Sequence, residues 1–387
     1  MVSMHRITKR PSRIALLATA AVMTLLLSLT ACTAPASEEA GNGDGRDSAA
    51  AALPAAAKLE AAVAAALAGT GVPGAAVIIT DGAGGESLAL YGEARPGAST
   101  SNDSIFAYRS ITKSFVGTVI LQLVEEGRLR LDSPVSEHLD GVPNGDRITI
   151  EMLGTMRSGL PNYSAAPGFG ELLVEDPSRE PDTSELLAVA FAEPRVFEPG
   201  TAYEYSNTNT LLLGEVVEAI TGDPWTTTVQ QRILRPLELE SVAYGFPMDE
   251  HAAAGFQLAD GTVVEELPIV ASGWFGAAGG LTGNVRDLAE WGRALGSGSL
   301  LDAETQSQRL ALLGPTSDDT ASPRYDRYGF AMGEIEGWTG HTGNGLGFQS
   351  LTMHDVKQGR TIAILLNGTG EDPDLPAGVF EQLLGLF

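Results

Sequence analysis

The sequence predicts a mixed α/β (α+β) fold, in which an antiparallel sheet is built from both chain ends, flanked by helices, and interrupted by a mostly helical insert. Strand-like segments occur at 74–92 and return from residue 328 onward. Between them, from about 148 to 265, short helical segments alternate with long loops rich in proline. Because consecutive strands tend to share a sheet, we expect the two ends to pair around a helical region.

The N-terminal elements follow from local composition. Residues 58–68 are rich in alanine and favour a helix. Residues 74–80 (GAAVIIT) and 86–92 (ESLALYG) are typical of two strands joined by a glycine-rich turn. Residues 111–126 carry apolar side chains at helical spacing, and Gly127 ends that pattern.

The C-terminal part predicts strands separated by short turns. From Tyr328 the segments are YGFAMGEI, GWTGHTG, GFQSLTMHD and TIAILLN, and residues 375–386 suit a closing helix. We therefore assign the sheet to about 58–108 and 266–387, and the helical region to about 109–265. Hairpin connections are expected around Glu336, Asn344-Gly345 and Gln358-Gly359.

Composition excludes several classes of function. The chain has 387 residues, 43% of them hydrophobic, which is enough for a large core. Its formal net charge of -25 argues against nucleic acid as a partner, because a phosphate backbone requires a basic surface. The single cysteine and five scattered histidines offer no metal-ligand spacing, so we expect neither a metal nor another cofactor.

The N-terminus has the pattern of an export signal. Residues 1–13 are basic, residues 14–31 are apolar, and Leu-Thr-Ala precedes Cys32, the only cysteine. This resembles the lipobox of bacterial lipoproteins, which implies cleavage before Cys32, diacylation of its thiol, and attachment to the outer face of the cell membrane. An uncleaved transmembrane anchor and ordinary secretion are the alternatives. Residues 32–57 are typical of a flexible tether, and 58–387 of the folded domain.

Three short motifs occur in an order that suggests nucleophilic catalysis. Ser110 and Lys113 form the only S-x-x-K, at the start of the apolar helix, where a spacing of three places both side chains on one face. Tyr205 and Asn207 form the only Y-x-N, and His341 begins the only [KH]-[ST]-G, on an expected strand. Each motif alone has an ordinary structural explanation, such as a capping serine or an edge histidine. No G-x-S-x-G is present, so an α/β-hydrolase triad lacks its marker.

The motif order resembles the β-lactamase and D-Ala-D-Ala-peptidase superfamily, in its class C branch. The segments SIFAYRSITKSFVG, FEPGTAYEYSNTNTLLLGEVVE and GHTGNGLGFQS are similar to that branch, and the resemblance runs from about residue 58 to the C-terminus. Two positions depart from it. Met156-Arg157 replaces a segment that often reads His-Thr in relatives, and His341 stands where class C β-lactamases carry lysine.

The resemblance implies an acyl-enzyme mechanism. Ser110 would be the nucleophile, and Lys113 and Tyr205 together would act as base and acid, with the tyrosine pKa lowered by the neighbouring lysine. Backbone N–H groups of Ser110 and Asn344 would bind the oxyanion. The substrate-binding residues would be Asn207, His341, Thr342, Gly343 and Asn344, and the pocket would be shaped by Trp274, Phe275 and Gly279-Gly280.

The substrate and the role of His341 stay open at this stage. The expected substrate is a small molecule or peptide, with a D,D-carboxypeptidase or endopeptidase of cell-wall peptides first. A promiscuous esterase or peptidase, a weak β-lactamase, and a non-catalytic envelope-ligand-binding lipoprotein are the alternatives. A charged His341 would attract a substrate carboxylate, whereas a neutral one would be a hydrogen-bonding strand residue.

Overall fold

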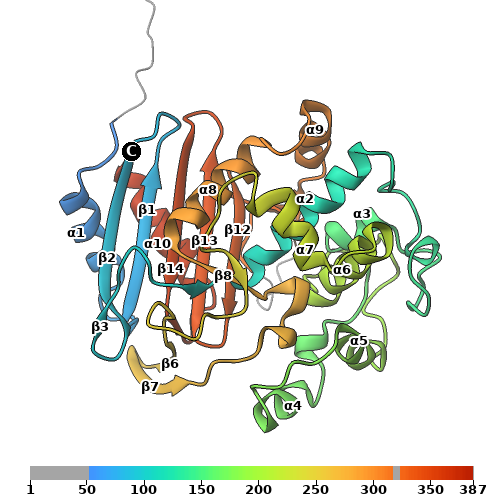
Figure 1. Ribbon diagram of the computed structural model, residues 1–387, viewed down its shortest axis with the longest axis horizontal. Coiled ribbons are helices and arrows are strands. Elements are labelled where there is room, and N and C mark those ends of the chain that lie inside the picture. Colours follow the sequence, from blue (N-terminus) through green and yellow to red (C-terminus); the bar gives the residue numbers. More distant parts are fainter. Residues whose placement is uncertain (1–51, 317–322, 387) are drawn as a thin grey trace, which may run out of the picture. The chain divides into compact units, whose positions relative to one another are not determined.

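Nine antiparallel strands form the main sheet, and both ends of the folded region contribute to it (Figure 1). The computed structural model describes residues 52–316 and 323–386. The strand order β3-β2-β1-β14-β13-β12-β11-β10-β9 places β1 beside β14, which confirms the predicted fold class. The strands are β1 (Gly74–Thr80), β2 (Glu86–Arg95), β3 (Ala98–Ser99), β9 (Gly314–Pro315), β10 (Arg327–Tyr328), β11 (Gly333–Ile335), β12 (Trp338–Gly345), β13 (Phe348–Asp355) and β14 (Arg360–Leu366).

Helices cover the sheet and form the region inserted between its two halves. The central one, α2, is buried along almost its whole length. Its Phe115 stacks on Trp291 of α8, with ring centres 3.8 Å apart, and its other side packs on α6. Most of its side chains are apolar, which suits this enclosed position. The helices are α1 (Ala56–Ala66), α2 (Thr112–Glu125), α3 (Ile150–Gly154), α4 (Phe169–Glu175), α5 (Thr183–Phe191), α6 (Asn207–Thr221), α7 (Trp225–Val229), α8 (Val285–Ser297), α9 (Ala303–Ala311) and α10 (Leu375–Leu383).

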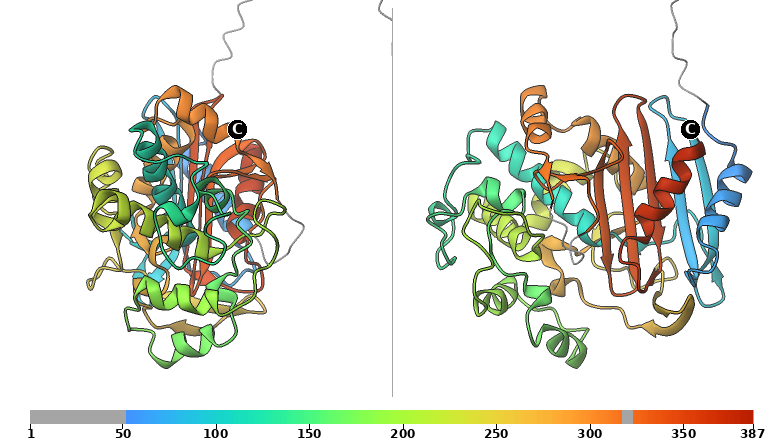
Figure 2. Two further views of the ribbon diagram at one scale, coloured as in Figure 1. Left: turned by 90° about the vertical axis from the view of Figure 1, so that its right-hand side faces the viewer. Right: turned by 180° about the vertical axis from the view of Figure 1, so that it is seen from behind.

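The sheet separates two hydrophobic cores because successive strand residues face opposite sides. Val77 and Ile79 of β1 belong to the core that includes residues of α1 and α10. Ala76 and Ile78 belong to the core that includes residues of α2 and α8. The two views in Figure 2 show α10 on one side of the sheet and α8 on the other. Both faces of β1 and β14 are therefore covered, which explains their nearly continuous apolar sequences.

Several elements differ from the sequence prediction. Helix α1 begins at Ala56, inside the predicted tether. The expected strand at 328–335 is interrupted, because Ala331 adopts a left-handed φ of 48° between β10 and β11. A hairpin of strands also lies within the region expected to be helical. The minor strands are β4 (Phe106–Ala107), β5 (Ala243–Tyr244), β6 (Gly255–Ala259), β7 (Thr262–Leu267), β8 (Leu281–Gly283) and β15 (Gly368–Thr369).

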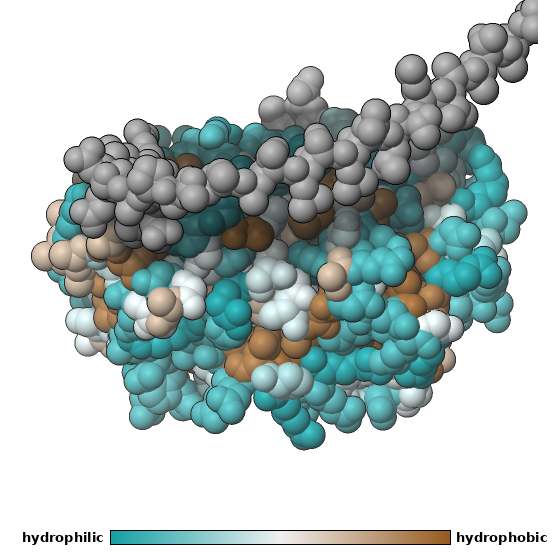
Figure 3. Space-filling model, turned by 90° about the horizontal axis from the view of Figure 1, so that it is seen from above, coloured by the Kyte–Doolittle hydropathy of each residue, from teal (hydrophilic) through white to brown (hydrophobic). Residues whose placement is uncertain are grey.

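The predicted signal segment 1–31 and Cys32 lie outside the described residues. Within 52–316 and 323–386, no helix combines the length and apolar character needed to cross a bilayer. The face of the molecule drawn in Figure 3 is mainly hydrophilic where it is coloured, with apolar side chains in small groups. This agrees with the excess of acidic residues in the sequence.

Candidate active site

Ser110 lies at the junction between a short 3₁₀ helix, Arg109–Ile111, and α2. Arg109 has a left-handed φ of 50°, so the backbone turns sharply just before the serine. Ser110 is half-buried and lines two cavities. A strained residue beside an accessible hydroxyl is a frequent feature of functional sites.

Lys113 is the group closest to the Ser110 hydroxyl. Its side chain is fully buried, and its Nζ lies 2.9 Å from Ser110 Oγ and 2.6 Å from the carbonyl oxygen of Ala278. It forms no salt bridge with a carboxylate among the described residues. Burial lowers the pKa of Lys113 well below its usual value. The amine is thereby made available as a base toward the serine proton.

Tyr205 is the third member of this cluster. The Lys113 Nζ lies 5.2 Å from the centre of the Tyr205 ring. The buried Tyr205 hydroxyl has no hydrogen-bond partner among the described residues. The Ser110 hydroxyl is nevertheless near enough to lower the pKa of Tyr205 slightly. Burial raises the pKa of Tyr205 well above its usual value, so the expectation of a lowered tyrosine pKa is wrong. The reason is burial, which disfavours the charged phenolate more than the nearby Ser110 hydroxyl favours it.

Asn207 begins α6 and faces the same space. Its Nδ2 donates a hydrogen bond to Ser164 Oγ at 2.8 Å, and its backbone N–H donates to Asn162 Oδ1 at 3.2 Å. Ser164 follows the Asn162 turn and also lines both cavities around Ser110. Ser164 could not be singled out from the sequence, because a serine in a loop is common and belongs to no motif here.

The third motif lies on β12, next to the segment that carries Ser110. At Gly343, a Cβ atom would lie 2.3 Å from the Tyr108 carbonyl oxygen, so only glycine permits this close approach. Thr342, Gly343 and Asn344 consequently reach the cavity beside the serine.

The side chain of His341 is not at the cavity surface, which corrects its predicted contact with substrate. It is fully buried, with Nε2 3.0 Å from the Tyr328 hydroxyl and Nδ1 3.1 Å from the Tyr325 hydroxyl. Nδ1 also lies 2.6 Å from the Thr342 carbonyl oxygen, to which it must donate its proton. Burial, reinforced by Lys113, lowers the pKa of His341 to about 3. The neutral alternative therefore describes this histidine.

Two cavities meet at Ser110. The first, here called the apolar cavity, has a volume of about 380 Å³. The second, the polar cavity, has a volume of about 210 Å³. Ser110, Ser164, Asn207 and Asn344 line both. The apolar cavity adds mainly Arg109, Tyr163, Phe169, Leu173, Trp274 and Phe275, and the polar cavity adds mainly Asn162, Tyr205, Thr342, Gly343, Pro323 and Asp374.

Arg109 brings a buried cation to the apolar cavity. Its guanidinium lies 4.1 Å from the centre of the Phe275 ring, and it donates hydrogen bonds to the carbonyl oxygens of Gly345 (2.8 Å) and Leu346 (3.1 Å). Burial lowers the pKa of Arg109 to about 9. These bonds join the segment before Ser110 to the turn after Asn344. Sequence reasoning missed this residue, because its role depends on a turn far along the chain.

A family model, Beta-lactamase, matches residues 59–385. The chain belongs to this family. It is a member of the β-lactamase and penicillin-binding-protein superfamily of serine hydrolases, as the motif order predicted.

Among curated relatives, the chain is similar to "Protein flp" of Staphylococcus aureus (strain MW2), with 26% identity over 68% of this chain and 52% of that protein. It is also similar to the D-alanyl-D-alanine-carboxypeptidase/endopeptidase AmpH of Escherichia coli (strain K12), with 28% identity over 46% of each chain. The chain thus spans about half the length of these curated relatives. Among solved structures, a D-stereospecific amidohydrolase from Streptomyces sp. is 30% identical, with a TM-score of 0.73 over 86% of this chain and 99% of that one.

The Met156-Arg157 departure lies outside both cavities of this family member. Met156 is buried in the same core as Tyr205, and its carbonyl oxygen accepts a hydrogen bond from the backbone of Glu204 at 3.0 Å. Arg157 donates to the carbonyl oxygen of Pro315. The segment with the departure therefore lies against the loop that carries Tyr205. Of the residues expected to shape the pocket, Trp274, Phe275 and Gly279 line the apolar cavity, whereas Gly280 packs against Tyr244.

Proposed function

We propose that this protein hydrolyses amide bonds of small D-amino-acid-containing peptides through a covalent acyl-enzyme on Ser110. The observation that carries the proposal is the short contact between Lys113 Nζ and Ser110 Oγ. The lysine is buried there and forms no salt bridge with a described carboxylate. The names of two similar proteins, a D-alanyl-D-alanine-carboxypeptidase/endopeptidase and a D-stereospecific amidohydrolase, support the substrate class.

The proposed reaction begins with proton transfer from Ser110 to the unprotonated Lys113 as Ser110 Oγ bonds to the substrate carbonyl carbon. Backbone N–H groups of Ser110 and Asn344 would stabilise the oxyanion, and the Asn207 amide would hold the acyl chain. The proton then passes through the neutral Tyr205 hydroxyl to the leaving nitrogen as the C–N bond breaks. Water, activated by the same pair, releases the acid and restores the serine.

The test is intact-mass analysis after incubation with a penicillin, a neutral ester and a phosphonate probe. We expect one covalent adduct, located on the peptide containing Ser110, and its loss in folded Ser110→Ala. Adduct formation that persists in that variant would refute the assignment of the nucleophile. Rapid release of penicillin would instead favour a β-lactamase.

We also propose that the protein is exported and anchored by a diacylated Cys32, on the basis of the Leu-Thr-Ala-Cys sequence. Two acyl chains are expected to hold a protein stably on a membrane, whereas one chain gives only marginal attachment. Cys32→Ala should move the protein out of the membrane fraction or leave its precursor uncleaved. Unchanged fractionation and migration would refute the anchor.

A further inference from the structure

The polar cavity differs from the apolar cavity in the charge that it offers beside Ser110. Among its described lining residues, Asp374 is the only acid, and none is Lys, Arg or His. The apolar cavity has the opposite character, since Arg109 lines it and none of its lining residues in the described part of the chain is an acid.

The position of Tyr205 indicates which cavity receives the leaving group. Tyr205 lines the polar cavity and not the apolar one. In the proposed function, Tyr205 delivers the proton to the leaving nitrogen, so that nitrogen must lie on the tyrosine side of Ser110. The acyl group then extends toward the aromatic side chains of the apolar cavity.

The nearby cation Arg324 offsets the charge of Asp374 only in part, because burial outweighs its effect and raises the pKa of Asp374. Arg324 directly follows the lining residue Pro323 but does not itself line the cavity. Its guanidinium pairs with Glu381 at 2.6 Å. Among the described residues, the Asp374 carboxylate accepts one hydrogen bond, from the backbone N–H of Arg324 at 3.3 Å. His341 is buried and neutral, and Lys113 is fully buried beneath Ser110. A carboxylate entering this cavity would therefore meet the carboxylate of Asp374, whose charge Arg324 balances only in part.

We propose that the polar cavity is a leaving-group subsite in which Asp374 selects amines that carry an ammonium group, accepts neutral ones, and disfavours those that end in a carboxylate. This inference rests on the proposed function and narrows its substrates to amides whose leaving amine is neutral or carries an ammonium group. A carboxypeptidase substrate, whose leaving group ends in a carboxylate, would be disfavoured. In the acylation step, the ester bond to Ser110 forms, the C–N bond breaks, and the amine leaves with the serine proton through the polar cavity. Asp374 does not react; it positions the leaving group by charge.

The test uses three amides with the same N-acetyl-D-alanyl acyl group. Their leaving groups are D-alanine, D-alaninamide and ethylenediamine, which end in a carboxylate, a neutral amide and an ammonium group. At about pH 8, where both the ammonium and Asp374 are charged, we expect kcat/KM to rise in that order. A partly exposed charge pair gives a few-fold effect in each direction, so the total range should be roughly tenfold.

Asp374→Asn should compress this range to roughly twofold or less, because a few-fold charge effect is all that is removed. The matched control is Glu371→Gln, which removes the same charge from an exposed residue outside the polar cavity. A wild-type preference for the D-alanine substrate, or an equal effect of the two variants, would overturn the inference.

Failure of the proposed function and failure of the Asp374 inference can be distinguished by experiment. Ester hydrolysis that survives Ser110→Ala would refute the nucleophile, whereas Ser110-dependent hydrolysis without charge discrimination refutes only the role of Asp374. If no amide is cleaved, the inference is tested by measuring how well small ions protect Ser110 from labelling by a neutral phosphonate. Propylammonium should slow labelling more than propionate does, and equal protection would overturn the inference.

Discussion

At the residue scale, the environment of Lys113 determines the pH range in which the site can react. Burial lowers its pKa well below the usual value, so the free amine persists at lower pH than for an exposed lysine. The base is present above this lowered pKa and is lost as pH falls through it. We expect acylation by a neutral ester to decline on the acid side only, measured as the labelling rate of Ser110.

Lys113→Met should lower that acylation rate by ~10²–10⁴-fold, as expected for removal of a general base. Lys58→Met, an exposed lysine on α1, is the control and should leave the rate unchanged. If Lys113 and Tyr205 act as one unit, the double variant with Tyr205→Phe should be scarcely slower than the slower single variant. Fully multiplicative losses would show that the two side chains work independently.

His341 contributes to stability rather than to substrate charge recognition. Its pKa is about 3 in the folded chain and ~6.5 when unfolded. Between these values the unfolded chain binds the additional proton, so the free energy of unfolding should rise with pH, by up to roughly 1.4 kcal/mol per pH unit. His341→Gln should lose this slope in denaturant titrations, and exposed His251→Gln should retain it. Equal slopes in all three proteins would contradict the buried neutral histidine.

At the element scale, elements with strong local patterns could be predicted from the sequence. The apolar spacing of 111–126 predicted α2, found at Thr112–Glu125, and the closing strands were found as β12, β13 and β14. The hairpin of β6 and β7 was missed, because β7 is largely exposed and its sequence shows no buried face. Such a strand is specified by pairing with a neighbour, which local periodicity does not reveal.

The interruption between β10 and β11 has a tertiary cause in Arg309 of α9. This arginine is almost fully buried, and it donates hydrogen bonds to the carbonyl oxygens of Phe330 (3.1 Å) and Ala331 (3.3 Å) and to Thr118 Oγ1 (3.0 Å). Ala331 also donates its N–H to the Gly154 carbonyl oxygen. The turn at Ala331 is therefore held by residues from other elements, and the sequence of the strand alone predicted a continuous strand.

Arg309→Met should destabilise the protein by about 1–3 kcal/mol, because it leaves buried carbonyl oxygens without donors. The measurements are the free energy of unfolding and hydrogen exchange at the Ala331 amide, which should accelerate. Arg130→Met, which removes an exposed arginine, should change neither. A variant as stable as the wild type would mean that relief of the buried charge offsets the lost hydrogen bonds.

At the scale of the whole molecule, the candidate site combines residues that the sequence could and could not identify. Ser110, Lys113 and Tyr205 were found because each belongs to a short motif with defined spacing. Asp374 could not be found, since it lies in the loop before α10 and reaches the cavity only through the fold. The burial of His341 was also hidden, because it depends on tyrosines contributed by the segment around β10.

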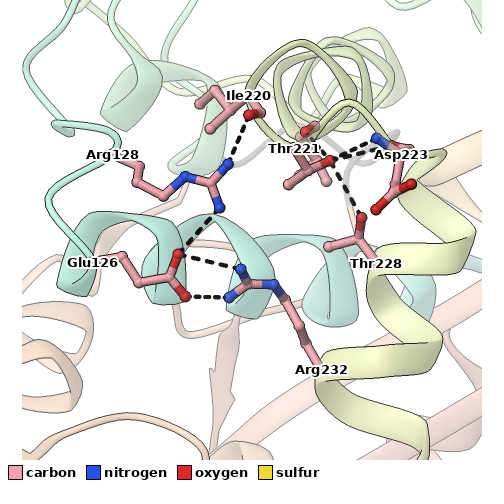
Figure 4. A network of polar contacts seen from close by, with 8 residues as sticks. Glu126, Arg128, Ile220, Thr221, Asp223, Thr228 and Arg232 are labelled. Carbon is pink, nitrogen blue, oxygen red and sulfur yellow. Dashed lines mark hydrogen bonds and ion pairs between the residues drawn. The ribbon is translucent and has the colours of Figure 1, made fainter.

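The helical region contains a network of polar contacts around Glu126 (Figure 4). Glu126, at the end of α2, contacts Arg232 (2.5 and 3.2 Å) and Arg128 (3.3 Å). Arg128 in turn donates to the carbonyl oxygen of Ile220, in α6, at 2.7 Å. A helix of this length extends about 21 Å, so the network stabilises the end of α2 opposite Ser110.

Glu126→Gln should therefore affect stability and leave catalysis unchanged. The three charged side chains are 25–40% exposed, so solvent screens them, and the expected loss is about 1 kcal/mol or less in the free energy of unfolding. That loss should shrink at high salt, because screening weakens the wild-type contacts. The control is Glu60→Gln, an exposed acid on α1 that makes no salt bridge with a described residue. A change in kcat/KM for the neutral ester, or a loss independent of salt, would show that α2 transmits this network to Ser110.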